Sequence, residues 1–196
     1  MITRSQLRVK RYFDLFLALI LLPILLLPIV ILIIACTIDT KMWGLFKQKR
    51  VGQSAKLFNI YKLRTLKKEH HQLGELDRSA TRLGKFLRST KLDELPQLFN
   101  VIKGEMSFVG PRPDVQGFAD VLEGEDRKIL IVKPGITGPA TLKYKDEERV
   151  LERQKDPDHY NRNIIWVDKV KINKNYVENY SFYLDLKFII KSTLNL

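Results

Sequence analysis

The sequence predicts an α/β fold, mainly α, that is attached to a membrane. Residues 15–38 form an uncharged apolar run, which is longer than the roughly 20 residues that a membrane helix needs. Residues 56–65 alternate between apolar and polar side chains, as a half-buried strand does. Helical spacing of apolar residues recurs over 82–88 and after Pro96. We therefore expect an N-terminal anchor over residues 1–40, followed over 41–196 by a domain with a small β-hairpin and amphipathic interfacial helices around one central helix.

The composition of this chain favours anionic partners. The chain has 196 residues, of which 45% are hydrophobic, and 34 Lys and Arg against 22 Asp and Glu give a net charge of +12. Such a balance favours phosphates, nucleic acid or an acidic lipid surface, and composition does not choose among these. The lone Cys36 excludes an internal disulfide, and because it lies in the apolar run we interpret it as an inert buried thiol.

The apolar run is interpreted as a retained anchor rather than a cleaved signal peptide, because residues 33–38 lack an A-x-A site. Basic residues stand on both flanks, so a hairpin that returns to its side of entry fits the positive-inside rule better than a span. Pro23 and Pro28 provide a means of breaking the helix. Charge and proline content leave re-entrant and spanning anchors both open. The basic flanks are Arg4, Arg8, Lys10 and Arg11 before the run, and Lys41, Lys47, Lys49 and Arg50 after it.

Beyond the anchor, the pattern predicts a hairpin of two strands around Gly52 and then a polar loop or surface helix over 67–81. The adjacent His70 and His71 in that segment do not suggest a metal site, because neighbours in sequence do not share a helix face. An amphipathic basic helix is expected over 82–88, either on an anionic membrane surface or packed on the core with a solvated face. A second interfacial helix is expected over 176–191, with core aromatics as its alternative.

Two adjacent acids, Asp93 and Glu94, precede Pro96. A capping box from Thr90 to Asp93 would put Pro96 inside the helix, where proline costs about 3 kcal/mol. A helix that begins at or just after Asp93 places the proline in the first turn and ends at Gly104. Asp93 is then either an inert cap or a reactive carboxylate at an anion site. Because adjacent anions repel, Glu94 implies a divalent metal or a cluster of Arg and Lys. The alternative for Glu94 is an ordinary first-turn residue that interacts with the helix dipole.

A single arginine, Arg112, stands between two prolines, which restrict its backbone and suit a preset guanidinium for bidentate phosphate binding. An ordinary surface arginine is the alternative. Lys62, Arg64 and Arg88 are the candidates to complete a basic pocket.

Three segments carry a resemblance to a known family. Ile60-Tyr-Lys-Leu-Arg-Thr65, the long run from Leu92-Asp-Glu-Leu-Pro to Val-Gly-Pro-Arg-Pro113, and Lys133-Pro-Gly-Ile-Thr-Gly138 resemble the small monotopic phosphoglycosyl transferases among the bacterial sugar transferases. The resemblance covers nearly the whole chain, and its central motif is highly specific.

The resemblance implies transfer of a phosphosugar from a UDP-sugar to polyprenyl phosphate, such as undecaprenyl phosphate, with release of UMP. It implies that Asp93 is the nucleophile of a covalent intermediate, that Glu94 is its partner, that Mg²⁺ binds at this pair, and that Arg112 holds phosphate. It also implies a re-entrant helix-break-helix anchor in a bacterial inner membrane, with a catalytic domain on the cytoplasmic face and the central helix beside the nucleophile.

Two departures from the family pattern leave details open. Leu27 replaces the usual serine before Pro28, and Pro23 is additional, so either proline is a candidate for the break. The run Pro139-Ala-Thr-Leu-Lys-Tyr144 replaces a commoner segment, and with it the preference for sugar or nucleotide is open. The sequence names neither the sugar nor the pathway, and a homodimer is one option for the oligomeric state.

A competing interpretation is a noncatalytic basic membrane module that recruits nucleic acid. Such a module needs an exposed basic face with stacking aromatics, whereas the aromatics here gather at the presumed membrane edge. We therefore expect no nucleic-acid partner.

Overall fold

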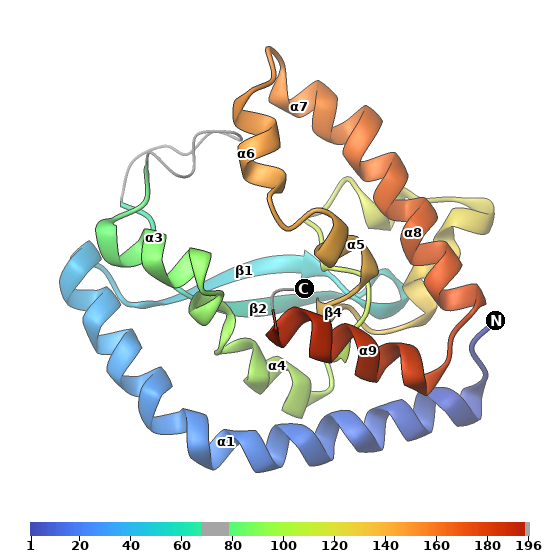
Figure 1. Ribbon diagram of the computed structural model, residues 1–196, viewed down its shortest axis with the longest axis horizontal. Helices are drawn as coiled ribbons and strands as arrows, with labels where there is room; N and C mark the ends of the chain where they lie inside the picture. Colours follow the sequence, from blue (N-terminus) through green and yellow to red (C-terminus); the bar gives the residue numbers. More distant parts are fainter. Residues whose placement is uncertain (68–78, 195–196) are drawn as a thin grey trace.

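A long bent helix and two small β-sheets organise the chain in this computed structural model, which describes residues 1–67 and 79–194 (Figure 1). The helices are α1 Arg4–Thr40, α3 Arg82–Ser89, α4 Gln97–Lys103, α5 Pro139–Lys143, α6 Glu147–Glu152, α7 Pro157–Tyr160, α8 Trp166–Glu178 and α9 Phe182–Thr193. The strands are β1 Leu45–Val51, β2 Leu57–Leu63, β3 Ser107–Val109 and β4 Gly135–Thr137. The mainly helical α/β class, the long apolar helix and the small sheet are as predicted.

The first helix, α1, is continuous over Arg4–Thr40 although Pro23 and Pro28 lie inside it. A capping box starts it, in which the Gln6 backbone N–H donates to Thr3 Oγ1 at 3.2 Å and the Thr3 N–H donates to Gln6 Oε1 at 2.8 Å. Figure 1 shows α1 bend along its length. The expected helix-break-helix is thus a bend without an interruption, because a proline removes one backbone donor while the neighbouring turns keep theirs.

Both ends of α1 are bonded to the rest of the chain. Before the helix, the Ile2 N–H donates to the Val177 carbonyl at 3.0 Å. After it, the Gly44 N–H donates to Thr37 Oγ1 at 2.9 Å and the Gly44 carbonyl accepts from the Arg64 N–H at 2.7 Å. Helix α1 therefore wraps one side of the domain and does not project from it (Figure 1).

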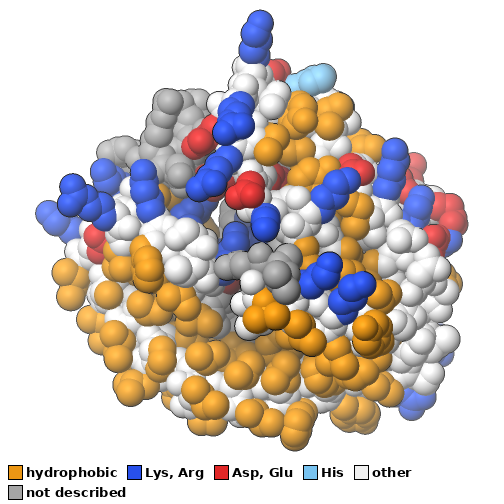
Figure 2. Space-filling model, viewed as in Figure 1, with side chains coloured by type: hydrophobic (Ala, Val, Ile, Leu, Met, Phe, Trp, Pro, Cys, Tyr) orange, Lys and Arg blue, Asp and Glu red, His pale blue; other side chains and the backbone are white. Residues whose placement is uncertain are grey.

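One face of α1 is buried and the other is apolar and exposed. Ala18 packs with Leu98 and Val101 of α4, and Cys36 packs with Leu63 and Leu87, as expected of a buried thiol. By length and composition α1 is sufficient to cross a bilayer. Figure 2 shows hydrophobic side chains gathered where α1 runs. The exposed apolar residues of α1 are Val9, Tyr12, Phe16, Leu19, Ile20, Ile24, Leu26, Leu27, Val30, Ile31, Ile34 and Ile38.

The predicted hairpin is confirmed. Strands β1 and β2 are antiparallel, with Leu45 opposite Leu63 and Val51 opposite Leu57. A short helical turn follows Gly52 and closes the connection. The helix predicted over 82–88 is also present as α3, which begins directly after the cap residue Thr81. The expected loop with His70, His71 and Gly74 lies outside the described residues.

The structure contains a second sheet that the sequence did not predict. Strands β3 and β4 pair in parallel, with Ser107 opposite Gly135 and Val109 opposite Thr137. The backbones approach so closely that a Cβ on Gly135 would lie 2.1 Å from the Gly110 nitrogen. Three-residue strands are too short to show a period in the sequence, which is why this pair was not predicted.

The C-terminal region forms two helices, α8 and α9. The prediction of a single interfacial helix over 176–191 is therefore wrong in part. Tyr176 and Tyr180 are buried, and their hydroxyls donate to the two oxygens of Asp185 at 2.6 and 3.2 Å. Tyr183 and Ile190 on α9 are exposed, by 72% and 56%. The buried carboxylate explains the difference, since it draws both tyrosine hydroxyls inward.

A buried ion pair joins the two ends of the chain. Lys10 Nζ lies 2.5 Å from Asp185 Oδ2, and both side chains are at most 5% exposed. The pair and the two tyrosines together satisfy the Asp185 carboxylate and fix α1 against α9.

We predict that Lys10→Met destabilises the fold by about 3–5 kcal/mol, because it leaves Asp185 charged and buried without its cation. The denaturation midpoint of the purified protein in detergent measures this loss. The double variant Lys10→Met, Asp185→Asn is expected to recover most of it, and a double variant as unstable as the single one would contradict the assignment.

Candidate active site

Asp93 and Glu94 lie on a 3-10 helical turn, Leu92–Glu94, between α3 and α4. The turn begins at Lys91, whose φ of 60° is left-handed, and α4 begins after the cap residue Pro96. Asp93 therefore stands one turn before α4 and not at its N-terminus as predicted. The structure places the proline at the helix start and Gly104, with φ 81°, at its end, as expected.

The capping-box alternative does not hold. Thr90 ends α3, and its hydroxyl donates backward to the Phe86 carbonyl at 2.8 Å and the Leu87 carbonyl at 3.2 Å. Its oxygen therefore serves the preceding helix and does not cap the turn that carries Asp93.

Glu94 is the centre of an ion cluster that joins three elements. Lys62 of β2 donates to Glu94 Oε1 at 2.9 Å, and Arg112 donates to Oε1 through Nη2 and contacts Oε2 through Nη1 at 3.4 Å. Burial alone would raise the pKa of Glu94, but the charges and hydrogen bonds of Arg112 and Lys62 outweigh it and hold that pKa well below its ordinary value. The sequence predicted that a cation must offset the repulsion between the two acids. Lys62 and Arg112 supply this positive charge.

Asp93 differs from its neighbour. Its side chain is 6% exposed, and burial together with the negative charge of Glu94 raises its pKa above the ordinary 3.8. Lys62, Arg88 and Arg112 oppose this rise through their positive charges. No described residue donates a hydrogen bond to its carboxylate, whereas Glu94 accepts hydrogen bonds from both Lys62 and Arg112. A desolvated carboxylate of this kind, surrounded by cations, is suited to nucleophilic attack on a phosphate.

The structure brings together three of the four predicted phosphate-binding residues. Lys62 and Arg112 contact Glu94, and Arg88, at the end of α3, lies close enough to Asp93 to influence its pKa. Arg64 is directed elsewhere, because its Nε donates to the Trp43 carbonyl at 2.9 Å and its guanidinium lies 5.3 Å from the Phe46 ring centroid. It packs at the end of α1 and does not join the cluster.

Two side chains that the sequence did not point to complete the surroundings. Asn100 of α4 is fully buried, and its amide donates to the Asn59 carbonyl and to Glu105, each at 2.7 Å, while its oxygen accepts from the Tyr61 N–H at 3.1 Å. It thereby fixes β2 beside α4 and sets the direction of the adjacent Lys62. Asn in a helix gives no signal of this long-range role, so only the fold reveals it.

Glu148 of α6 is the second such residue, and it accepts a hydrogen bond from Arg88. Figure 2 shows a hollow on this face that Lys, Arg and acidic side chains surround. A glutamate in a charged helix is typical of a solvated surface, so the sequence gives no signal that Glu148 binds Arg88.

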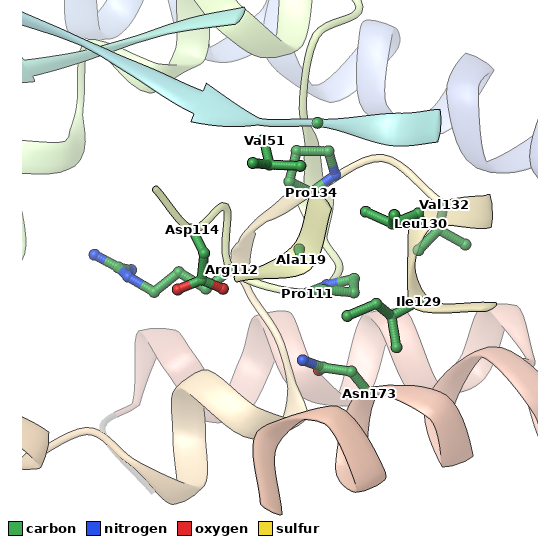
Figure 3. Close-up of a pocket in the computed structure, with 11 residues that line it drawn as sticks. Val51, Pro111, Arg112, Asp114, Ala119, Ile129, Leu130, Val132, Pro134 and Asn173 are labelled. Carbon is green, nitrogen blue, oxygen red and sulfur yellow. The ribbon is translucent and has the colours of Figure 1, made fainter. Parts of the chain in front are cut away.

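A small cavity adjoins the ion cluster through Arg112, which is one of its lining residues. Its volume is about 20 Å³, enough for about one water molecule. Figure 3 shows Asn173 directed into it from α8, whereas the guanidinium of Arg112 extends away from its apolar lining. Asn173 Oδ1 is buried and finds no partner among the described residues, so a single bridging water suits this cavity.

The acids can supply part of a metal site. In residues 1–67 and 79–194 no group of three or more His, Cys, Asp or Glu side chains is arranged to hold a metal. Mg²⁺ in proteins commonly takes only one or two carboxylates and completes its shell with water and substrate phosphates. Asp93 and the weakly engaged Oε2 of Glu94 fit that smaller requirement.

Comparison with known proteins gives a consistent result. Residues 5–196 match the family model described as bacterial sugar transferase. The sugar transferase EpsL of Bacillus subtilis, itself uncharacterised, is 35% identical over 184 residues, which are 92% of this chain and 83% of that protein.

Two longer relatives carry more specific names. The UDP-N-acetylgalactosamine-undecaprenyl-phosphate N-acetylgalactosaminephosphotransferase of Aeromonas hydrophila is 30% identical over 94% of this chain and 42% of that protein. The UDP-glucose:undecaprenyl-phosphate glucose-1-phosphate transferase of Escherichia coli K12 is 33% identical over 92% of this chain and 38% of that protein. This chain thus spans less than half the length of these two relatives.

Asp114 yields a prediction on stability. Burial raises its pKa to about 6, against the opposing charges of Lys169 and Arg50. Because the folded chain binds this proton more tightly than the unfolded chain, the free energy of unfolding falls as pH rises from 3.8 to about 6. Asp114→Asn removes this loss and is expected to raise the melting temperature at neutral pH by roughly 2–4 °C, which corresponds to about 1 kcal/mol.

The test compares melting curves of both proteins in detergent across that pH range. Below the ordinary carboxylate pKa the two are expected to differ little. Equal pH dependence of the two melting temperatures would contradict the prediction.

Proposed function

The chain belongs to the bacterial sugar transferase family, and on this premise we propose that it transfers a phosphosugar from a UDP-sugar to undecaprenyl phosphate and releases UMP. The names of the relatives support sugar-1-phosphate transfer to undecaprenyl phosphate as the reaction class. The observation that carries the proposal is the unequal pair of acids, in which two cations occupy Glu94 while Asp93 stays buried without a hydrogen bond from the described residues.

We propose a reaction in two steps. An Asp93 carboxylate oxygen attacks the phosphorus that carries the sugar, a new O–P bond forms, and the bond to the UMP oxygen breaks. An oxygen of undecaprenyl phosphate then attacks the same phosphorus, and the Asp93 carboxylate leaves. Splitting the transfer in this way replaces one difficult step by two displacements at a positioned centre.

The cations have distinct parts in this proposal. Arg112 uses two of its donors on Glu94, and its side chain is still 34% exposed, so further N–H groups remain for a phosphate. Lys62 and Arg88 add positive charge that acts on Asp93 and lowers its pKa. Glu94 orients Arg112 and Lys62 and thereby preorganises the charge that stabilises the equatorial phosphate oxygens.

Magnesium completes the proposal. Asp93 and Glu94 Oε2 are the groups that would hold it, together with donor phosphate oxygens and water. When bound, the ion neutralises charge that develops on the phosphates.

We further propose that α1 is a re-entrant anchor on the cytoplasmic face of the inner membrane. The bonds from both ends of α1 to the same domain support this, because a straight crossing would carry one end to the opposite side. The exposed apolar face of the bent helix then lies in lipid. The domain beyond residue 40, with Asp93, stays beside the surface where a lipid phosphate is presented.

The sugar is left to experiment. The named relatives use N-acetylgalactosamine and glucose donors, and the unusual segment of this chain falls largely in α5. A panel of UDP-sugars is therefore the first substrate set to test.

We predict that Asp93→Asn abolishes UMP release and the phosphosugar adduct, with a loss of at least about 10³-fold, because the amide is not a nucleophile. UMP release from the UDP-sugar panel and mass spectrometry of the Asp93 peptide measure the two effects. Glu94→Gln is the matched comparison, since it keeps Asp93 and is expected to form the adduct slowly.

Wild-type turnover by Asp93→Asn would remove Asp93 from the mechanism. An unchanged melting temperature of the variant serves as the control for folding. Chelation of divalent ions is expected to stop turnover, and activity that persists in chelator would overturn the magnesium proposal.

The anchor gives a prediction of its own. In a Cys36→Ser background, Ser5→Cys before the bend and Ser192→Cys in α9 are both expected to react with a membrane-impermeant thiol reagent from the cytoplasmic side, because a re-entrant helix returns to it. Labelling of inverted and right-side-out vesicles measures this. Reaction of the two cysteines from opposite sides would show a spanning helix.

A further inference from the structure

Helix α6 carries two adjacent glutamates, and each binds a cation from a different element. Glu147 accepts from Lys169 of α8 at 2.7 and 2.6 Å, and Glu148 accepts from Arg88 of α3. Figure 1 shows α6 between α3 and α8. Leu151 is the only buried residue of α6, so these ion pairs are a large part of what holds the helix in place.

Arg88 connects α6 to the candidate site. It lies in the last turn of α3, shortly before the turn Leu92–Glu94 that carries the two acids, and its positive charge lowers the pKa of Asp93. Without a counter-ion, a free guanidinium at this position would be drawn onto the Asp93 carboxylate and would occupy the oxygens needed for attack. Glu148 gives Arg88 a different partner while no phosphate is present.

Only one of the two carboxylate oxygens of Glu148 has a hydrogen-bond partner among the described residues. One carboxylate oxygen accepts from Arg88, whereas Oε1 is buried and has no hydrogen-bond partner among the described residues. A buried acceptor without a partner is destabilising, and it regains hydrogen bonds when it moves into water. The glutamate side chain is 28% exposed, so this carboxylate stands next to solvent.

We propose that Glu148 is an internal counter-anion that holds Arg88 in the ligand-free protein and releases it to the diphosphate of the nucleotide sugar. This rests on the proposed function, and it adds that α6 competes with the donor for a shared cation. Glu148 is thus a positioning residue that acts through Arg88. Removal of its charge is expected to tighten donor binding, whereas loss of a purely structural contact would weaken it.

The test measures the dissociation constant of UDP for the whole protein in detergent by calorimetry. Glu148→Gln is expected to bind UDP roughly two- to fivefold more tightly, the range that corresponds to a partly exposed ion pair. Glu125→Gln is the matched control, because it removes the same charge from a 73% exposed glutamate that pairs with Lys128. In an Arg88→Gln background, the Glu148 substitution is expected to have no effect on UDP binding.

Unchanged or weaker UDP binding by Glu148→Gln would overturn the proposal, and so would an equal gain in the Glu125 control or in the Arg88→Gln background. Melting curves test folding, and Glu148→Ala, which suits a helix, replaces the Gln variant if that protein does not fold. Absence of UDP binding and turnover in the wild type would overturn the proposed function and this inference together. A wild type that binds and turns over the donor, with no gain in the Glu148 variants, overturns this inference alone.

Discussion

One buried carboxylate, Glu94, is the constraint on which the candidate site depends. It brings Lys62 from the hairpin and Arg112 from the loop after β3 to the turn that carries Asp93. Lys62 and Arg112 both bind Glu94 Oε1, and without this anion between them the two cations would repel each other. Because Glu94 is ionised and accepts hydrogen bonds from both Lys62 and Arg112, the positive charge beside Asp93 exists before any substrate arrives. The neighbouring Asp93 then experiences both the burial and the negative charge that raise its pKa.

The fold brings this cluster next to the anchor through α4. The helix follows the pair of acids directly and packs Leu98 and Val101 against Ala18 of α1. Arg11 of α1 closes the other end of α4 by donating to the Val101 and Ile102 carbonyls at 2.6 and 2.9 Å. The acids are therefore one short helix away from the apolar face of α1. This proximity suits the proposed transfer from a soluble donor to a lipid phosphate.

Local signals allowed part of the structure to be predicted. The hairpin around Gly52, helix α3 and the end of α4 at Gly104 each depend on alternation, helical spacing or a glycine in left-handed conformation, and these act within a few residues. The position of Pro96 excluded the capping box for the same reason. Local signals do not predict the position of a side chain that is set by contacts with residues far away in the sequence. Tyr176 and Tyr180 were predicted at the membrane interface, but they are buried because their hydroxyls bind Asp185, which also pairs with Lys10. Arg64 was predicted beside Lys62 in the basic pocket, but its side chain binds the Trp43 carbonyl.

By itself, the sequence determined the long apolar helix, the two acids, the proline-flanked arginine and the family to which the chain belongs, because each is encoded in contiguous residues. Only the tertiary structure decided which acid is neutralised, which cations gather around it, and that Glu148 reaches Arg88 across 60 residues of chain. The physical reason is that charge interactions depend on distance and burial in space. The parallel pairing of β3 with β4, which the sequence did not reveal, is what holds the strand that leads to Arg112 in place.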